Sequence, residues 1–108
     1  MVHIHTLRIA WNRARLLIAE GRPEEAEPAM RSMLARLAGH PEAGALIDEE
    51  AQTRLWLGRA LLARHRGADA EPELLRAVAL RERLDDPASL WLAEARRELA
   101  RARSATRP

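Results

Sequence analysis

Residues 13–37 (RARLLIAEGRPEEAEPAMRSMLARL) and residues 57–81 (LGRALLARHRGADAEPELLRAVALR) resemble each other at a shift of 44 positions. Eight of the 25 aligned pairs are identical, whereas this composition gives about three identities by chance over such a window. The identical pairs are Arg15/Arg59, Leu17/Leu61, Ala19/Ala63, Arg22/Arg66, Ala26/Ala70, Glu27/Glu71, Pro28/Pro72 and Ala35/Ala79. The chain therefore contains an internal duplication of one structural unit.

Each copy has the pattern of two helices joined by a short turn. Apolar residues recur at spacings of three and four, and residues 21–23 and 66–67 interrupt this periodicity. Acidic residues follow each interruption, which suits the N-terminus of a second helix because carboxylates compensate the helix dipole there. Pro28 and Pro72 are expected in the first turn of these second helices, where a missing N–H has no intrahelical partner.

A fifth helix is expected over about residues 87–103, with Asp86 as its cap, and residues 104–108 are expected to fray. Its apolar face is predicted to contain Leu92, Ala95, Leu99 and Ala102. The helix before it is predicted to bury Leu74, Leu75, Val78 and Leu84. The expected fold is an all-α solenoid in one domain (1–103), with two antiparallel hairpins, about 5–39 and 46–84, and a C-terminal capping helix.

The composition supports the all-α class and argues against disulfide-linked and membrane-spanning proteins. The 108 residues include 22 Ala, 17 Leu, 18 Arg and 12 Glu, all strong helix formers, and they suit a single domain. No cysteine is present, which excludes disulfides and agrees with a cytoplasmic protein. The sequence pI of about 10.8 reflects arginine without lysine or tyrosine, because the net charge is only +2. Uncharged runs are far shorter than the roughly 20 residues of a membrane span, so no membrane association is expected.

Several of these residues resemble a tetratricopeptide repeat (TPR). The second copy matches through Leu57, Gly58, Leu61, Ala70, Leu74 and Ala77, and the first copy matches through Ala14, Leu17, Gly21, Ala26 and Met30. Ala-Glu-Pro at 26–28 and 70–72 is similar to the longer variant found in kinesin light chains and many bacterial regulators and kinases. Arg13 and His65 depart from the family pattern, and the 44-residue shift also overlaps the range of HEAT-like repeats.

The resemblance implies binding of a protein or peptide on a concave face lined by the first helix of each hairpin. A small residue at Gly58 would let the two helices approach, with an alanine of the second helix in the gap. Matched positions give a concave groove formed by Arg8, Trp11, Arg15, Ile18, Gln52, Leu55, Arg59 and Leu62. Arg15 and Arg59 would lie side by side and suit an acidic peptide, because a guanidinium can bind a carboxylate through two hydrogen bonds. Alternatively, each arginine pairs with a glutamate of its own or the adjacent helix and forms a solvated face.

Self-association is a second function class. Leu90, Trp91 and Leu92 are consecutive, and one helix cannot bury all three on one face. Either Trp91 packs back onto Val78 and its neighbours, or it meets a second chain. We therefore expect a homodimer as the alternative to a peptide-binding domain.

Catalysis, metal binding and cofactors are not expected. His3 and His5 read as a mobile pair, and the carboxylate pairs lie at helix starts, where capping explains them. The basic run of the last helix (Arg96, Arg97, Arg101, Arg103 and Arg107) offers a nucleic-acid alternative. Glu94 and Glu98 interleave with this run, and basic residues also suit a helix C-terminus, so the structural interpretation is preferred.

Overall fold

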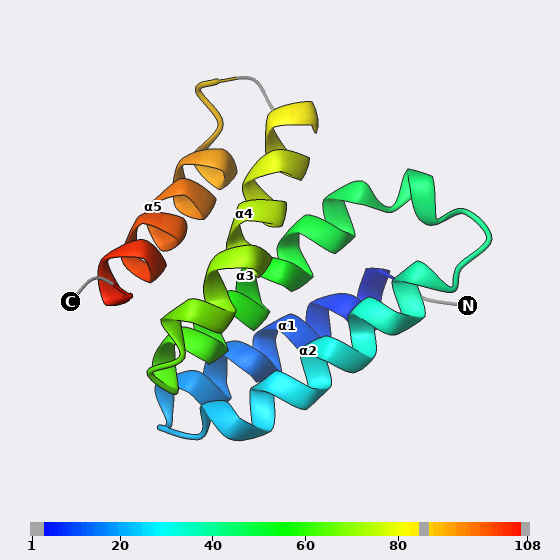
Figure 1. Ribbon diagram of the computed structural model, residues 1–108. Helices are drawn as coiled ribbons and strands as arrows, with labels where there is room; N and C mark the ends of the chain where they lie inside the picture. Colours follow the sequence, from blue (N-terminus) through cyan, green and yellow to red (C-terminus); the bar gives the residue numbers. More distant parts are fainter. Residues whose placement is uncertain (1–3, 85–86, 107–108) are drawn as a thin grey trace.

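The computed structural model describes residues 4–84 and 87–106, and every element within these ranges is helical (Figure 1). This confirms the all-α class. The α-helices are α1 (Ile4–Ala19), α2 (Pro23–Ala38), α3 (Ile47–Ala63), α4 (Gly67–Leu84) and α5 (Leu90–Ala105), and a short 3-10 helix, η1 (Ala43–Ala45), precedes α3.

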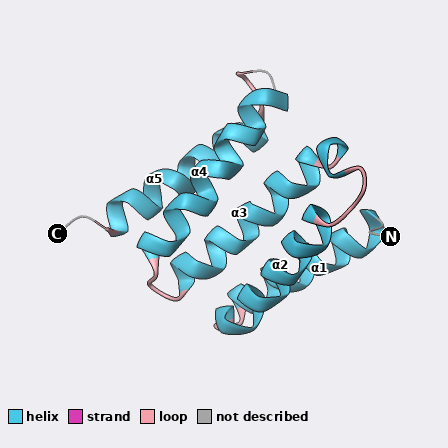
Figure 2. Ribbon diagram, turned by 45° about the vertical axis from the view of Figure 1, so that its right-hand side comes forward, coloured by secondary structure: helices cyan, strands magenta, loops and turns pink. Residues whose placement is uncertain are grey.

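Helix α3 lies in the middle of the array, with α1 and α2 on one side and α4 and α5 on the other (Figure 2). It contacts all four other helices, and each α-helix packs against the next along the chain. The contacts of α3 with α1 and α5 place these three helices in one layer. The predicted architecture of two hairpins followed by a terminal helix is therefore confirmed.

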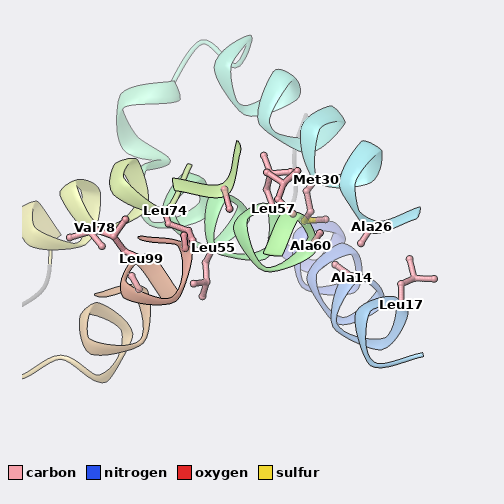
Figure 3. Packing of buried hydrophobic residues seen from close by; sticks show 14 of the residues in the cluster. Ala14, Leu17, Ala26, Met30, Leu55, Leu57, Ala60, Leu74, Val78 and Leu99 are labelled. Carbon is pink, nitrogen blue, oxygen red and sulfur yellow. The ribbon is translucent and has the colours of Figure 1, made fainter. Parts of the chain in front are cut away.

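One apolar core runs through all five α-helices. Its fully buried side chains include Met30 from α2, Leu57 from α3 and Leu74 from α4 (Figure 3). Leu61 from α3 is fully buried as well. The predicted stripe of α5 is buried as expected (Leu92, Ala95, Leu99 and Ala102). In α4 the prediction is half wrong, because Leu74 and Val78 are buried whereas Leu75 and Leu84 are exposed.

Gly58 sets the close approach of α3 to α4. A Cβ atom added there would lie 2.4 Å from Leu74 Cδ2 and 2.5 Å from Leu74 Cγ. The gap beside the glycine is therefore filled by Leu74, in place of the alanine that the TPR resemblance implied. Ala70 and Ala77 are also fully buried on α4.

The two copies share their turn geometry. Gly21 (φ 76°) and His65 (φ 59°), which correspond under the 44-residue shift, both adopt the left-handed conformation. Each donates its N–H to the residue three positions before it, and the next N–H bonds to the carbonyl five positions before itself. These are the two hydrogen bonds of a Schellman motif, which ends a helix by satisfying its last carbonyl groups.

Several helix boundaries differ from the sequence-based expectation. Pro28 and Pro72 are each the sixth residue of their helices, beyond the first turn, so each removes one intrahelical hydrogen bond. The helix that starts after the second turn begins earlier than expected, at Gly67.

The last helix is also shifted. It begins at Leu90, and the Ser89 hydroxyl accepts a hydrogen bond from the Leu92 N–H at 3.4 Å. The expected cap, Asp86, lies outside the described residues. Ser104 and Ala105 continue the helix beyond its expected end at residue 103.

Candidate functional site

A hollow of about 280 Å³ opens between the first turns of α3 and α5, the end of α4 and the first half of α1. Six side chains line it: Arg8, Trp11, Asp48, Gln52, Arg81 and Trp91. We call it the tryptophan hollow. Arg8, Trp11 and Gln52 were predicted for the concave groove, and the structure brings them together here. Trp91 was predicted for self-association, and Asp48 and Arg81 were not predicted as site residues.

Trp11 is held in place by a buried threonine. Its indole Nε1–H donates to Thr53 Oγ1 at 2.9 Å, and the Thr53 hydroxyl donates to the Glu49 carbonyl at 2.8 Å. Thr53 is fully buried within α3. Sequence reasoning missed Thr53, because a single threonine in a helix carries no periodic signal that would identify its partner.

Arg81 fixes the opposite wall. Its side chain is almost fully buried and donates hydrogen bonds to Asp48 and to Gln52 Oε1, the latter at 3.1 Å. Its guanidinium carbon lies 5.2 Å from the ring centroid of Trp91, which is cation–π distance. Arg81 therefore ties the start of α3 to the end of α4 and supports the indole of α5. The sequence alone did not identify this role, because Arg81 is one of two basic residues in the last turn of α4.

The two arginines predicted to lie side by side, Arg15 and Arg59, differ in their ion pairing. Arg59 forms ion pairs with Glu94 of α5 at 3.0 Å and Glu98 at 3.9 Å, and it stacks over Trp56 at 4.7 Å. Pairing with an adjacent helix, the alternative interpretation, therefore describes Arg59. It does not describe Arg15, which is exposed and has no carboxylate within ion-pair distance among residues 4–84 and 87–106.

The other predicted groove residues serve the core. Leu55 is only 4 % exposed and belongs to the main apolar cluster, so it cannot line an open groove. Ile18 and Leu62 are half-buried and pack against the same cluster. Of the eight predicted groove residues, three line the tryptophan hollow: Arg8, Trp11 and Gln52.

The predicted self-association triplet is divided by the fold. Leu92 is buried in the core, whereas Leu90 is 85 % exposed and Trp91 is 59 % exposed. Trp91 contacts Arg81, one helical turn beyond Val78 on α4, and lines the tryptophan hollow. Two of the three residues remain available to a second chain.

A second charged cluster surrounds Glu27 at the boundary of the two hairpins. The nearly buried carboxylate accepts hydrogen bonds from Arg31 (3.0 Å), Arg64 (2.6 Å) and Arg66 (3.0 Å). Burial raises its pKa, but hydrogen bonds from Arg31 and Arg64 and the charge of Arg66 outweigh this and lower the pKa overall. Every charge in this cluster has a partner, so we assign it a structural role.

The C-terminal basic run is also largely paired. Arg96 lies 3.9 Å from Glu82, Arg101 lies 3.1 Å from Glu98, and Arg103 lies 3.4 Å from Glu71. Arg97 is exposed, and Arg107 lies outside the described residues. These ion pairs weaken the nucleic-acid interpretation of α5.

The described ranges contain no group of three histidine or acidic side chains that could hold a metal ion. His5 is exposed on α1, and His3 lies outside these ranges. Among the helices described, none is long and apolar enough to cross a lipid bilayer.

Comparisons with protein-family models, curated proteins and solved structures gave no match for this chain. The candidate site therefore rests on the geometry of the residues themselves.

Proposed function

We propose that this chain is a non-catalytic protein-interaction module of tetratricopeptide type, which binds a peptide or partner helix on the face formed by α1, α3 and α5. The observation that carries this proposal is the tryptophan hollow, in which Trp11 and Trp91 come from the two outer helices of that layer. Tryptophan and arginine are the residues that contribute most often to binding hot spots.

The hollow is suited to binding because internal contacts already fix its walls. Thr53 accepts a hydrogen bond from Trp11. Arg81 donates hydrogen bonds to Asp48 and Gln52, and its guanidinium group stacks on Trp91. Such preorganisation reduces the side-chain entropy that is lost on binding. Its volume, about 280 Å³, lies just below the range of about 300–1,000 Å³ typical of small-molecule sites, and therefore suits a side chain of a partner.

A pair of neighbouring substitutions tests the proposal. Trp91→Ala removes one wall of the hollow, whereas Leu90→Ser changes an adjacent, more exposed residue that does not line it. Partners captured from cells of the source organism by the wild-type chain should be lost with Trp91→Ala and kept with Leu90→Ser. Retention by both variants, with unchanged melting temperatures, would contradict the assignment of the site.

Homo-oligomerisation is the second candidate, and the exposure of Leu90 and Trp91 in the first turn of α5 favours it. In that case light scattering should give a mass above the monomer value of 12.2 kDa. Leu90→Ser should then return the chain to a monomer. A monomer at high micromolar concentration for the wild type would exclude this candidate.

A further inference from the structure

We infer that the partner is an acidic peptide segment in which two carboxylates flank an apolar side chain, and that α1 recognises it through Arg8, Trp11 and Arg15. This inference rests on the proposed function and names the chemistry of its ligand. It differs from the pairing of Arg15 with Arg59, because it places both recognition charges on a single helix.

The charges of the face formed by α1, α3 and α5 point to α1. On α3 and α4, the arginines near this face are neutralised within the chain: Arg59 pairs with Glu94, and Arg81 pairs with Asp48. On α1, Arg8 and Arg15 are both exposed, and neither has a carboxylate within ion-pair distance in the described part of the chain. The uncompensated positive charge of this face therefore lies on α1.

The duplication allows the surroundings of Arg15 to be compared with those of its ion-paired counterpart, Arg59. Arg59 corresponds to Arg15, and its partner Glu94 corresponds to Glu50 under the same shift of 44 positions. Glu50, however, pairs with Arg54 at 2.7 Å and lies 3.6 Å from Arg76 of α4. The carboxylate that corresponds to the partner of Arg59 is thus bound by other arginines.

Helical spacing arranges the three α1 residues along one stripe. Arg8 and Trp11 are three residues apart, and Trp11 and Arg15 are four apart, so they share one face. The two arginines are separated by about 10 Å along the helix axis. In an extended peptide, alternate side chains share a face, and two acids four residues apart lie about 13 Å apart. The flexible arginine side chains can span this difference, so the matching motif is acid, any residue, apolar residue, any residue, acid.

A nucleic acid fits the same surface less well. The evenly spaced phosphates of a nucleic acid would lie close to Asp48, whose side chain is 59 % exposed, and to the half-buried Glu94. These carboxylates would repel them. A short peptide can place two carboxylates on α1 alone and avoid these groups. The whole chain has a formal net charge of only +2, which gives little general attraction for a polyanion.

The inference is tested by selecting binders to the full chain from a displayed library of random peptides. We expect the selected peptides to contain the acid–apolar–acid motif. Their affinity should fall at least about tenfold for the double variant Arg8→Gln/Arg15→Gln, because two charge-assisted contacts are lost. The matched control is Arg36→Gln/Arg97→Gln, since both residues are exposed and lack ion pairs within the described ranges. That control should change affinity by no more than a factor of about two.

The outcomes separate the two levels of the proposal. Selected peptides that lack acidic residues and lose affinity with Trp91→Ala, yet bind Arg8→Gln/Arg15→Gln normally, would overturn the acidic-partner inference while the proposed function stands. A selection with no peptide sensitive to either Trp91→Ala or Arg8→Gln/Arg15→Gln would overturn both. Binding of a labelled single-stranded oligonucleotide that is weakened by Arg8→Gln/Arg15→Gln and blocks the selected peptides would overturn the inference in favour of a nucleic-acid partner.

Discussion

His65 adopts the left-handed backbone conformation that its counterpart in the first copy, Gly21, adopts without a side chain. The φ angles are 59° and 76°, and both residues make the same pair of helix-ending hydrogen bonds. A Cβ atom in this conformation approaches the following carbonyl and costs about 1–2 kcal/mol. The chain therefore retains the turn of the repeat although the residue best suited to it is missing from the second copy.

His65→Gly should stabilise the protein by about 1 kcal/mol, because relief of backbone strain exceeds the extra entropy of glycine in the unfolded chain. For a domain of this size the melting temperature should rise by about 5 °C in thermal unfolding followed by circular dichroism. The reciprocal control, Gly21→His, should lower it. An unchanged or lower melting temperature for His65→Gly would show that the side chain of His65 stabilises the turn in another way.

Among the helix contacts, the packing of α3 against α4 requires a residue without a Cβ atom at position 58. Leu74 is fully buried and occupies the space beside Gly58, with its Cδ2 2.4 Å from the position of an added Cβ. Since interiors are close-packed, neither helix can yield without disturbing its other neighbours. Gly58 is thus required by packing, in the middle of a helix where glycine is otherwise unfavourable.

Gly58→Ala should accordingly destabilise the protein, even though alanine is the better helix former. Overpacking costs about 1–3 kcal/mol, and the gain in helix propensity returns about 1 kcal/mol. The expected result is a lower denaturation midpoint in urea at an unchanged slope. The control is Gly44→Ala, because a Cβ there would meet no atom within 4 Å. Equal stability of Gly58→Ala and wild type would mean that α3 and α4 can separate freely.

The hairpins were predictable from sequence because periodicity, turns and duplication agree on the same elements. Helix starts were less predictable, since Pro28 fits the first turn by its chemistry but lies in the second turn, where packing tolerates one missing hydrogen bond. The site was predicted in part: Trp11 followed from repeat register, whereas the pairing of Arg59 with Glu94 depends on how α5 rotates against α3. Residue spacing within one helix carries no information about that rotation.

For the molecule as a whole, ion pairs connect successive helical units beyond what the apolar core provides. Glu27 of α2 binds Arg64 and Arg66 from the turn between α3 and α4, and so links the first hairpin to the second. Glu94 of α5 binds Arg59 of α3, and links the terminal helix to the second hairpin. The Glu27 carboxylate is nearly buried, so its pairs are screened less by solvent than exposed ones.

The link through Glu27 predicts how stability responds to acid. Its pKa is lower in the folded chain than in the unfolded chain, so the unfolded state binds more protons over the interval between the two values. The stabilisation is therefore complete above the ordinary glutamate pKa and is lost as pH falls through the folded value.

Glu27→Gln should lower the free energy of unfolding by about 1–2 kcal/mol at neutral pH, because charge-assisted hydrogen bonds become neutral ones. It should also flatten the dependence of stability on pH below the ordinary glutamate pKa, measured by urea unfolding at a series of pH values. The matched control is Glu24→Gln, since Glu24 is an exposed residue of the same helix with no ion pair in the described ranges, and it should keep the wild-type slope. If Glu27→Gln kept the wild-type slope as well, acid would act through other carboxylates, and the ion pairs of Glu27 would not contribute to the pH dependence of stability.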